Sequence, residues 1–123
     1  AELKAFINSV KDVFPEKKIT GIFQPHLYSR TRDFVKEFAT SLSLLDNVVL
    51  LDIYPAREKP IPEVDSGIIF NRLKNKGIKK LCSSSEVIKI LDSFEIQVLL
   101  TIGAGDIDKL VDPLRKWIQD KMK

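Results

Sequence analysis

The sequence predicts an α/β fold in which a mainly parallel, open sheet is covered by helices on both faces. Segments with the hydrophobic period of a helix alternate along the chain with short apolar runs that are rich in branched side chains. Three of these apolar runs are almost uninterrupted, which is typical of parallel strands buried on both faces. The fold class that follows is Rossmann-like, and residues 1–123 are expected to form one domain.

The first half of the chain is expected to contribute two helices and two strands. Apolar side chains at helical spacing predict a helix over residues 3–14, which Pro15 ends. Short branched runs predict strands over residues 19–23 and 48–53, the second of them buried. Between the two strands, the i, i+4 apolar pattern of residues 31–45 predicts one continuous helix.

The third helix and strand are expected over residues 66–76 and 78–82. Gly77 would lie at the C-cap of that helix, where a left-handed backbone favours glycine. The lysines of residues 78–82 suit a strand near the edge of the sheet.

The last part of the chain predicts two more helices around a strong strand. A capping box from Ser83 to Glu86 opens a helix over residues 84–94, and residues 95–102 form the strand. A final helix follows the turn at residues 103–106. Pro113 lies inside its pattern, so either the helix kinks there or a second segment begins at Pro113 with Asp112 as its cap.

The composition excludes several classes of protein. A net charge of +3 without a basic arm does not predict a nucleic-acid partner, and no apolar run approaches the roughly 20 residues that a membrane span needs. One cysteine and one histidine exclude a disulfide framework and disfavour a metal site. Because the chain opens with neither methionine nor a signal peptide, we expect a cytoplasmic fragment of a longer protein.

Three unusual stretches are expected at the carboxyl edge of the sheet, because each follows a predicted strand. They are residues 24–31, 52–60 and 103–106. Open parallel sheets bind ligands outside the carboxyl ends of their strands, at the point where the strand order reverses. A strand order of 3-2-1-4 would place the first and third stretches on either side of that point.

The first stretch offers His26, Arg30 and Thr31 as candidate binding residues. A neutral imidazole can donate and accept at once, and a guanidinium fork suits a carboxylate or a phosphate. Arg30 and Thr31 also stand at a predicted helix start, where free backbone N–H groups favour anions. The alternative interpretation is that His26 is a hydrogen-bonded turn residue and that Arg30 is a solvated surface charge.

The other two stretches supply Glu58 and the turn Gly103-Ala104-Gly105-Asp106. Glu58 is a candidate acceptor for an ammonium group or a ribose hydroxyl. The two glycines allow the backbone to approach a ligand closely, although a tight turn with Asp106 as helix cap explains the same residues. Asp52, late in a buried strand, is expected to be satisfied by loop N–H groups, and no residue is identified as catalytic.

Two motifs of nucleotide enzymes are missing from the sequence. It contains no GxxxxGK[ST] phosphate-binding loop and no acidic pair arranged to hold Mg²⁺. The chain alone is therefore expected to bind neither ATP nor a metal ion, and to have no ATPase or ligase activity.

Together and in this order, the three stretches resemble the C-terminal domain of the Mur ligases. Leu27 stands where many members have arginine, and Arg57 and Glu63 stand where many have glycine. The resemblance covers the chain from about residue 1 to its end and rests on Phe23 to Asp33, Asp52 to Glu58, Pro60-Ile61-Pro62 with Val64 and Ser66, and Gly103 to Ile107.

The resemblance implies an ATP- and Mg²⁺-dependent ligase of peptidoglycan synthesis that joins L-alanine to UDP-N-acetylmuramate through an acyl phosphate. This chain would be the lid of that enzyme, and the UDP-sugar and ATP-binding domains would lie outside it. Arg30 would pair with a substrate carboxylate, His26 would line the same pocket, and residues 103–106 would border it. Two alternatives stay open: a related ligase for another amino acid or a recycled peptide, and a stand-alone Rossmann-like binding module.

Overall fold

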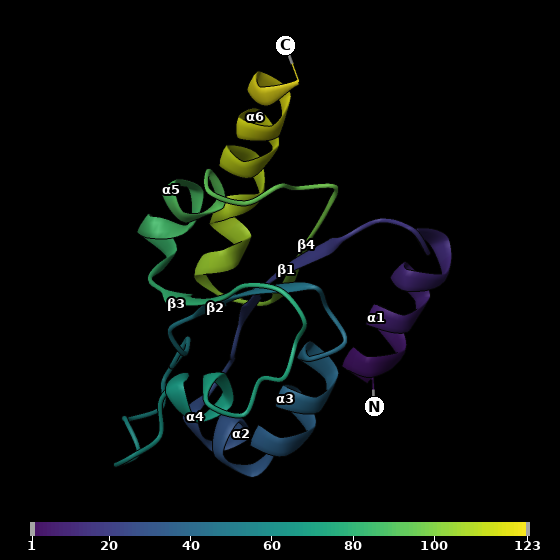
Figure 1. Ribbon diagram of the computed structural model, residues 1–123. Helices are drawn as coiled ribbons and strands as arrows, with labels where there is room; N and C mark the ends of the chain where they lie inside the picture. Colours follow the sequence, from purple (N-terminus) through teal and green to yellow (C-terminus); the bar gives the residue numbers. More distant parts are fainter. Residues whose placement is uncertain (1, 123) are drawn as a thin grey trace.

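The computed structural model describes residues 2–122, which form one four-stranded sheet with flanking helices (Figure 1). The strands are β1 (Ile19–Gln24), β2 (Asn47–Leu51), β3 (Lys79–Cys82) and β4 (Val98–Gly103). Their order in the sheet is β3-β2-β1-β4, and all three pairings are parallel. The predicted α/β class and the parallel sheet are confirmed, and the strand order is the 3-2-1-4 order that would place the first and third stretches beside the switch point.

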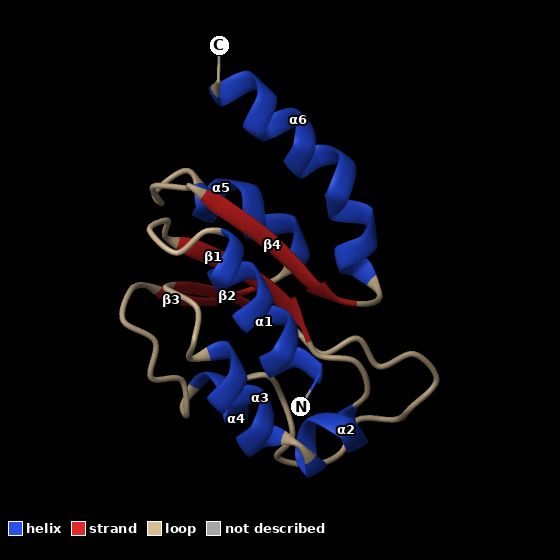
Figure 2. Cartoon of the chain, turned by 90° about the vertical axis from the view of Figure 1, so that its right-hand side faces the viewer, coloured by secondary structure: helices blue, strands red, loops and turns tan. Residues whose placement is uncertain are grey.

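Helices cover both faces of this sheet, as predicted. On one face lie α1 (Glu2–Val13), α3 (Val35–Leu42) and α4 (Gly67–Phe70), and on the other lie α5 (Val87–Leu91) and α6 (Val111–Lys121) (Figure 1, Figure 2). Each face has its own apolar core, because successive strand residues point to opposite sides. Val48 and Leu50 join the first core, whereas Val49 and Leu51 join the second.

The helix expected over residues 31–45 is two helices. The short helix α2 (Tyr28–Asp33) has Phe34 as its C-cap, and α3 begins at Val35. Phe34 has φ −120° and ψ 22°, outside helical geometry, although its N–H still donates to the carbonyl of Arg30. The apolar pattern continues across this break, and so the sequence alone did not reveal it.

The helix expected over residues 66–76 is only four residues long. Side-chain hydrogen bonds hold the following segment as a loop, because the Asn75 amide donates to the carbonyls of Asp46 and Ile78. Gly77 is therefore not a C-cap. Its N–H donates to the Asp46 carbonyl, and a Cβ at this position would lie 2.3 Å from Oδ1 of Asn47, so close approach of the backbone explains the glycine.

Strand β4 begins three residues later than expected and lies at an edge of the sheet. Its residues are half-buried or exposed, whereas every residue of β1 and β2 is buried. Its only strand partner in the described residues is β1. The prediction of a strand was right here, but an apolar run alone did not distinguish an edge strand from a central strand of the sheet.

The capping box at Ser83 and Glu86 is confirmed, and it opens a short 3₁₀ turn (Ser84–Glu86) before α5. At the end of the chain, a second 3₁₀ turn (Asp106–Leu110) precedes α6. The last helix is therefore split, but its cap is Leu110 and not Asp112. Pro113 is the third residue of α6, within the first turn, where a missing N–H breaks no intrahelical bond.

None of the helices in residues 2–122 combines the length and the apolar character that a membrane span requires.

Candidate functional site

The loops that follow β1 and β2 are joined at the carboxyl edge of the sheet. Tyr54 donates its N–H to the carbonyl of Pro25 at 2.8 Å, and Leu27 donates its N–H to the carbonyl of Tyr54 at 2.9 Å. The rings of His26 and Tyr54 stack with their centroids 5.9 Å apart and 13° between their planes. The parallel pairing of β1 and β2 thus continues past the strands and fixes where the imidazole lies.

The glycine turn after β4 packs against both of these loops. Gly103 has φ 116°, and a Cβ there would lie 2.3 Å from the carbonyl oxygen of Gln24. Gly105 has φ 108°, and a Cβ there would lie 2.3 Å from Cγ of Tyr54. Both positions exclude other residues by backbone conformation and by contact, so the turn requires glycine for its own geometry.

Gln24 links all three loops and was not among the predicted site residues. Its side chain is only 2% exposed. Its Nε2 donates to the carbonyl of Asp52 at 3.2 Å, and its Oε1 accepts the N–H of Ile107 at 2.8 Å. The one sequence signal was a polar amide at the end of a short, β-rich run, directly before Pro25.

A pocket of about 250 Å³ brings four of the predicted site residues together. Arg30 is exposed, and its guanidinium carbon lies 5.9 Å from the ring centroid of Phe34. Within residues 2–122 it forms no salt bridge, so its charge is available to a ligand. The pocket is lined by the predicted residues His26, Arg30, Gly103 and Ala104, together with Phe23, Gln24 and Phe38.

Thr31 and Glu58 lie in the same region but are bonded within the protein. The buried Thr31 hydroxyl donates to the carbonyl of Leu27 at 2.9 Å. Glu58 accepts the N–H of Ser29 at 3.1 Å through one carboxylate oxygen and the Ser29 hydroxyl through the other. These bonds hold the start of α2 in place, where Leu27 adopts φ 73°, a conformation that L side chains rarely take.

The environment of Glu58 favours its ionised form. The hydrogen bond from the Ser29 hydroxyl lowers the pKa of the Glu58 carboxyl below its ordinary value, against the opposing effect of desolvation. Because the Glu58 carboxylate already accepts hydrogen bonds from Ser29 at the start of α2, it can hold this loop in its conformation. Its predicted role as an acceptor for a substrate group remains a prediction.

The expected roles of two acidic residues, Asp106 and Asp52, are wrong. Asp106 is not a helix cap, because the cap of the 3₁₀ turn is Gly105 and the Ile107 N–H is taken by Gln24. Asp52 lies just beyond β2 and is exposed, so it is not a buried carboxylate satisfied by loop N–H groups. In both cases the strand or helix boundary lies one or more residues from the expected place.

No metal site is formed by this part of the molecule. Residues 2–122 contain no group of three or more His, Cys, Asp or Glu side chains that could hold an ion. Cys82 is buried at the end of β3, and burial raises the pKa of its thiol to about 11. A thiol of this kind stays protonated at neutral pH and is a poor nucleophile.

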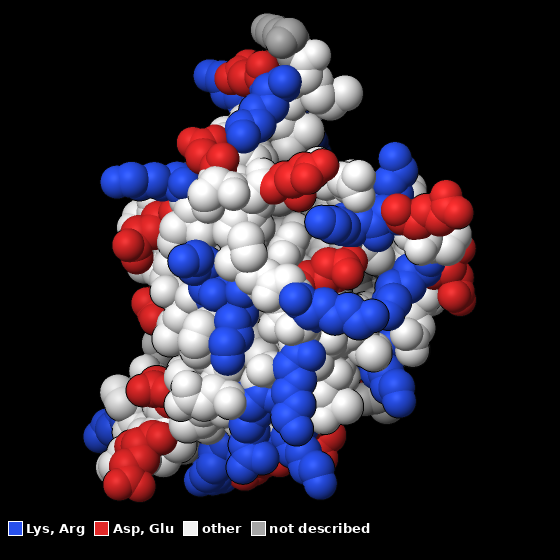
Figure 3. All heavy atoms as spheres, in the orientation of Figure 1, with Lys and Arg blue, Asp and Glu red and all other residues white. Residues whose placement is uncertain are grey.

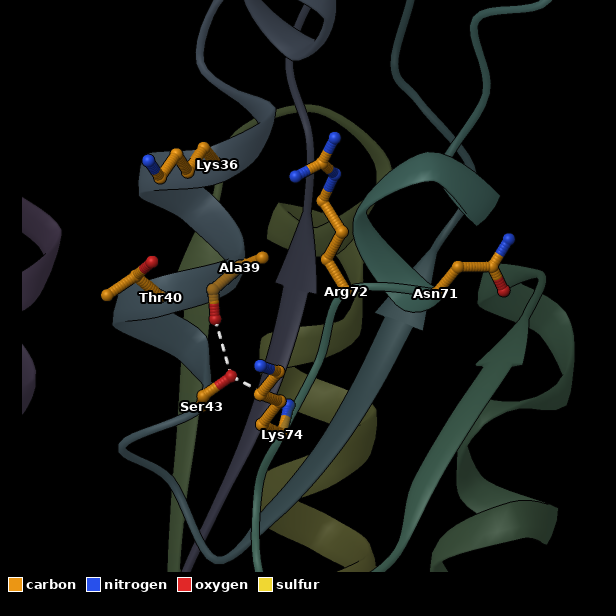
Figure 4. A pocket seen from close by; sticks show the side chains of 7 residues that line it. All are labelled: Lys36, Ala39, Thr40, Ser43, Asn71, Arg72 and Lys74. Carbon is orange, nitrogen blue, oxygen red and sulfur yellow. Dashed lines mark hydrogen bonds between the residues drawn. The ribbon is translucent and has the colours of Figure 1, made fainter.

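A larger pocket of about 420 Å³ lies between α3 and α4, away from the three loops. Positive side chains gather on the lower part of this face (Figure 3), where Figure 1 places α2, α3 and α4. Figure 4 shows Lys36 and Asn71 directed to opposite sides of the pocket. Ser43 already donates to the Ala39 carbonyl and accepts the N–H of Lys74. The polar groups do not converge, so this pocket is not the candidate site.

No family model matches the chain. The chain is 53% identical over 116 residues to a UDP-N-acetylmuramate–L-alanine ligase of Parabacteroides distasonis, across 94% of this chain and 25% of that protein. It is likewise 53% identical over 119 residues to the ligase of the same name from Porphyromonas gingivalis, across 96% of this chain and 26% of that protein. The chain therefore spans about a quarter of the length of these relatives.

A solved structure gives the same result at the level of the fold. The crystal structure of a UDP-N-acetylmuramate–alanine ligase from Thermotoga maritima superposes with a TM-score of 0.68 at 28% sequence identity. The match covers 98% of this chain and 24% of that one. By sequence and by fold, the chain belongs to the Mur ligase family, as a Mur ligase C-terminal domain.

Proposed function

We propose that this chain is the C-terminal domain of a longer, ATP-dependent ligase that joins L-alanine to UDP-N-acetylmuramate in cytoplasmic peptidoglycan synthesis. The observation that carries the proposal is the carboxyl-edge pocket. It gathers His26, Arg30, Gly103 and Ala104 in a chain that is 53% identical to proteins of that name. The pocket lies where open parallel sheets bind small molecules.

The proposed reaction makes an amide in two steps. ATP supplies a phosphoryl group to the carboxylate of the sugar nucleotide, which gives an acyl phosphate and ADP. The amine of L-alanine then attacks the acyl carbon, a C–N bond forms, and the C–O bond to phosphate breaks with loss of a proton from the amine. For this chain, the task is to hold the amino acid so that its free amine faces the acyl carbon.

Arg30 has the chemistry to hold the carboxylate of the amino acid. Its guanidinium is exposed on the pocket wall, and a fork of N–H donors matches the two oxygens of a carboxylate. His26, fixed by its stack with Tyr54, lines the same wall and can donate or accept a hydrogen bond. The glycine turn closes the other side, where only backbone and the small Ala104 side chain border the space.

In the proposed enzyme, ATP and Mg²⁺ would bind outside this chain. The sequence lacks a phosphate-binding loop, and residues 2–122 offer no cluster of metal ligands. We therefore assign no step of phosphoryl transfer to residues of this domain. The proposed partners of the chain are the UDP-sugar domain and the ATP-binding domain of the same protein, with no nucleic acid and no membrane.

The test is a ligation assay on the full-length protein that carries this chain. With ATP, Mg²⁺ and UDP-N-acetylmuramate present, mass spectrometry should detect the L-alanyl amide and an equal amount of ADP. Glycine, L-serine, L-glutamate and a short peptide are supplied separately. Preference for L-alanine supports the proposal, and preference for another amine identifies a related ligase. Binding of small molecules without any amide product would instead favour a stand-alone binding module.

A further inference from the structure

The strongest unassigned feature of the molecule is the buried amide of Gln24. It is 2% exposed, and both of its polar atoms are bonded to backbone groups of other segments. One partner is the carbonyl of Asp52, after β2, and the other is the N–H of Ile107, which lies 83 residues further along the chain. The side chain therefore bridges two loops that share no strand pairing, since β2 and β4 lie on opposite sides of β1.

The two bonds also place the pocket walls. Gln24 itself lines the pocket beside Arg30, and its own carbonyl oxygen contacts the position where Gly103 has no side chain. The N–H of Ile107 belongs to the 3₁₀ turn that directly follows the glycine turn. Loss of the amide would leave this N–H and the Asp52 carbonyl without their present partners, and the turn would lose its fixed distance from the loop after β2.

We propose that Gln24 is a positioning residue for the amino-acid substrate: its amide holds the glycine turn at the distance from the β2 loop that lets the pocket receive the substrate carboxylate. This inference rests on the proposed function for the identity of the substrate. The coupling of the two loops, in contrast, follows from the geometry of the fold alone.

The fold contains a matched control at the opposite edge of the sheet. The side chain of Asn47 is also buried, with 8% exposed. Its Nδ2 donates to Oγ1 of Thr20 at 3.1 Å, and its Oδ1 accepts the N–H of Ile78 at 2.9 Å. Asn47 thus bridges two segments as Gln24 does, with one donated and one accepted bond, but it lies at the amino end of β2, away from the pocket.

The experiment compares Gln24→Leu and Asn47→Leu in the full-length protein, with L-alanine varied and the other substrates saturating. We expect Gln24→Leu to lower kcat/KM for L-alanine by about 10-fold or more. It should also speed amide hydrogen exchange in the segment of residues 103–108. Asn47→Leu should speed exchange near Ile78 and leave kcat/KM for L-alanine within about twofold of wild type, since the bonds of Asn47 reach neither the pocket nor the glycine turn.

An isosteric pair of variants separates positioning from a general loss of packing. In Gln24→Glu, the ionised carboxylate can accept the Ile107 N–H but cannot donate to the Asp52 carbonyl, whereas the protonated carboxyl can do both. The ratio of its kcat/KM to that of wild type should therefore rise as the pH falls. His26, Asp52, Asp106 and Asp108, the native ionisable groups on the joined segments, are present in both proteins, so the ratio compares two proteins that differ only in the introduced carboxyl. Asn47→Asp should show a ratio that does not change with pH.

The outcomes separate the two proposals. Unchanged kcat/KM and unchanged exchange at residues 103–108 in Gln24→Leu would overturn the positioning role, as would equal losses in the Asn47 variants. If Gln24→Leu does not fold, the pH dependence of Gln24→Glu decides, and a flat ratio counts against the role. If wild type forms no alanine-dependent product, the proposed function fails, and faster exchange at residues 103–108 would still establish the bridge between the loops.

Discussion

Arg30 is the only cationic side chain that lines the pocket between the three loops, within the described residues. A charge-assisted hydrogen bond contributes about 1.5–3 kcal/mol, so Arg30→Ala should lower kcat/KM for the amino acid by about 10- to 100-fold. Because the side chain is exposed, the free energy of unfolding should change by no more than about 0.5 kcal/mol. Arg30→Lys should recover only part of the activity, since an ammonium cannot reproduce the fork.

Arg72→Ala is the matched control for Arg30→Ala. Arg72 is also exposed, but it borders the pocket between α3 and α4 instead of the carboxyl edge. Steady-state kinetics with the amino acid varied should give wild-type values for this variant. Wild-type kcat/KM in Arg30→Ala would remove Arg30 from the site and leave the interpretation of a solvated surface charge.

Glu58 makes stability depend on pH in a defined direction. Its bonds to Ser29 lower the pKa of the carboxyl below its ordinary value of 4.5. The ionised form therefore stabilises the fold above that ordinary value, and the contribution is lost as the pH falls through the lowered pKa. Urea unfolding should show Glu58→Gln to be less stable than wild type at pH 7, with the difference closing below about pH 4.

The control for Glu58→Gln is Glu63→Gln in the same loop. Glu63 is exposed, and its carboxylate makes no hydrogen bond to another part of residues 2–122. This variant should match wild type across the same pH range. A Glu58→Gln difference that stays constant or grows on acidification would show that the Ser29 bonds do not stabilise the fold.

Among the elements, the glycine turn at the end of β4 leaves no room for a side chain. Gly103→Ala would place a Cβ 2.3 Å from the backbone oxygen of Gln24, at a residue with φ 116°. Strain of the backbone and overpacking each cost about 1–3 kcal/mol, so the variant should lose roughly 2–5 kcal/mol of unfolding free energy. Gly67→Ala is the control, because its Cβ would meet only the end of the flexible Asp65 side chain. Equal effects of the two substitutions in urea unfolding would contradict this account of the turn.

The sequence predicted well those elements that form because of residues close to one another in the chain. The capping box at Ser83, the end of the first helix near Pro15 and the apolar core strand β2 each depend on neighbouring residues. The helix expected over residues 66–76 was wrong because a distant partner decides where it ends. The Asn75 amide donates to the carbonyl of Asp46, about 30 residues away, and this bond holds the segment after α4 as a loop. The hydrophobic period of a sequence does not reveal a contact between residues so far apart.

In the candidate site too, some residues could be predicted from the sequence and others could not. Four residues that line the pocket were expected from the sequence, because each follows a predicted strand: His26, Arg30, Gly103 and Ala104. Gln24 could not be predicted, since its role depends on burial and on a bond to Ile107 across the sheet. Nor could the sequence show that the Thr31 hydroxyl faces its own helix, because a threonine at a helix start can bond inward or outward.

At the scale of the whole molecule, a short parallel sheet presents one specialised edge. In the strand order β3-β2-β1-β4, β1 lies between β2 and β4. The end of β1 and the loop after it contact the loop after β2 and the glycine turn of β4. The opposite edge is held by structural bonds such as that of Asn47. In the proposed ligase, this specialised edge would face the substrates that the rest of the protein holds.

The chain spans about a quarter of the length of its relatives, so the proposed function requires it to supply an essential part of a larger active site. The most direct test measures phosphate release from ATP in the presence of UDP-N-acetylmuramate and L-alanine for three proteins. They are the full-length protein, the same protein without the residues of this chain, and the chain alone. We expect alanine-dependent release from the full-length protein only. Alanine-dependent release without this chain, or release by the chain alone above a heat-inactivated control, would contradict the proposed role of the chain in a larger active site.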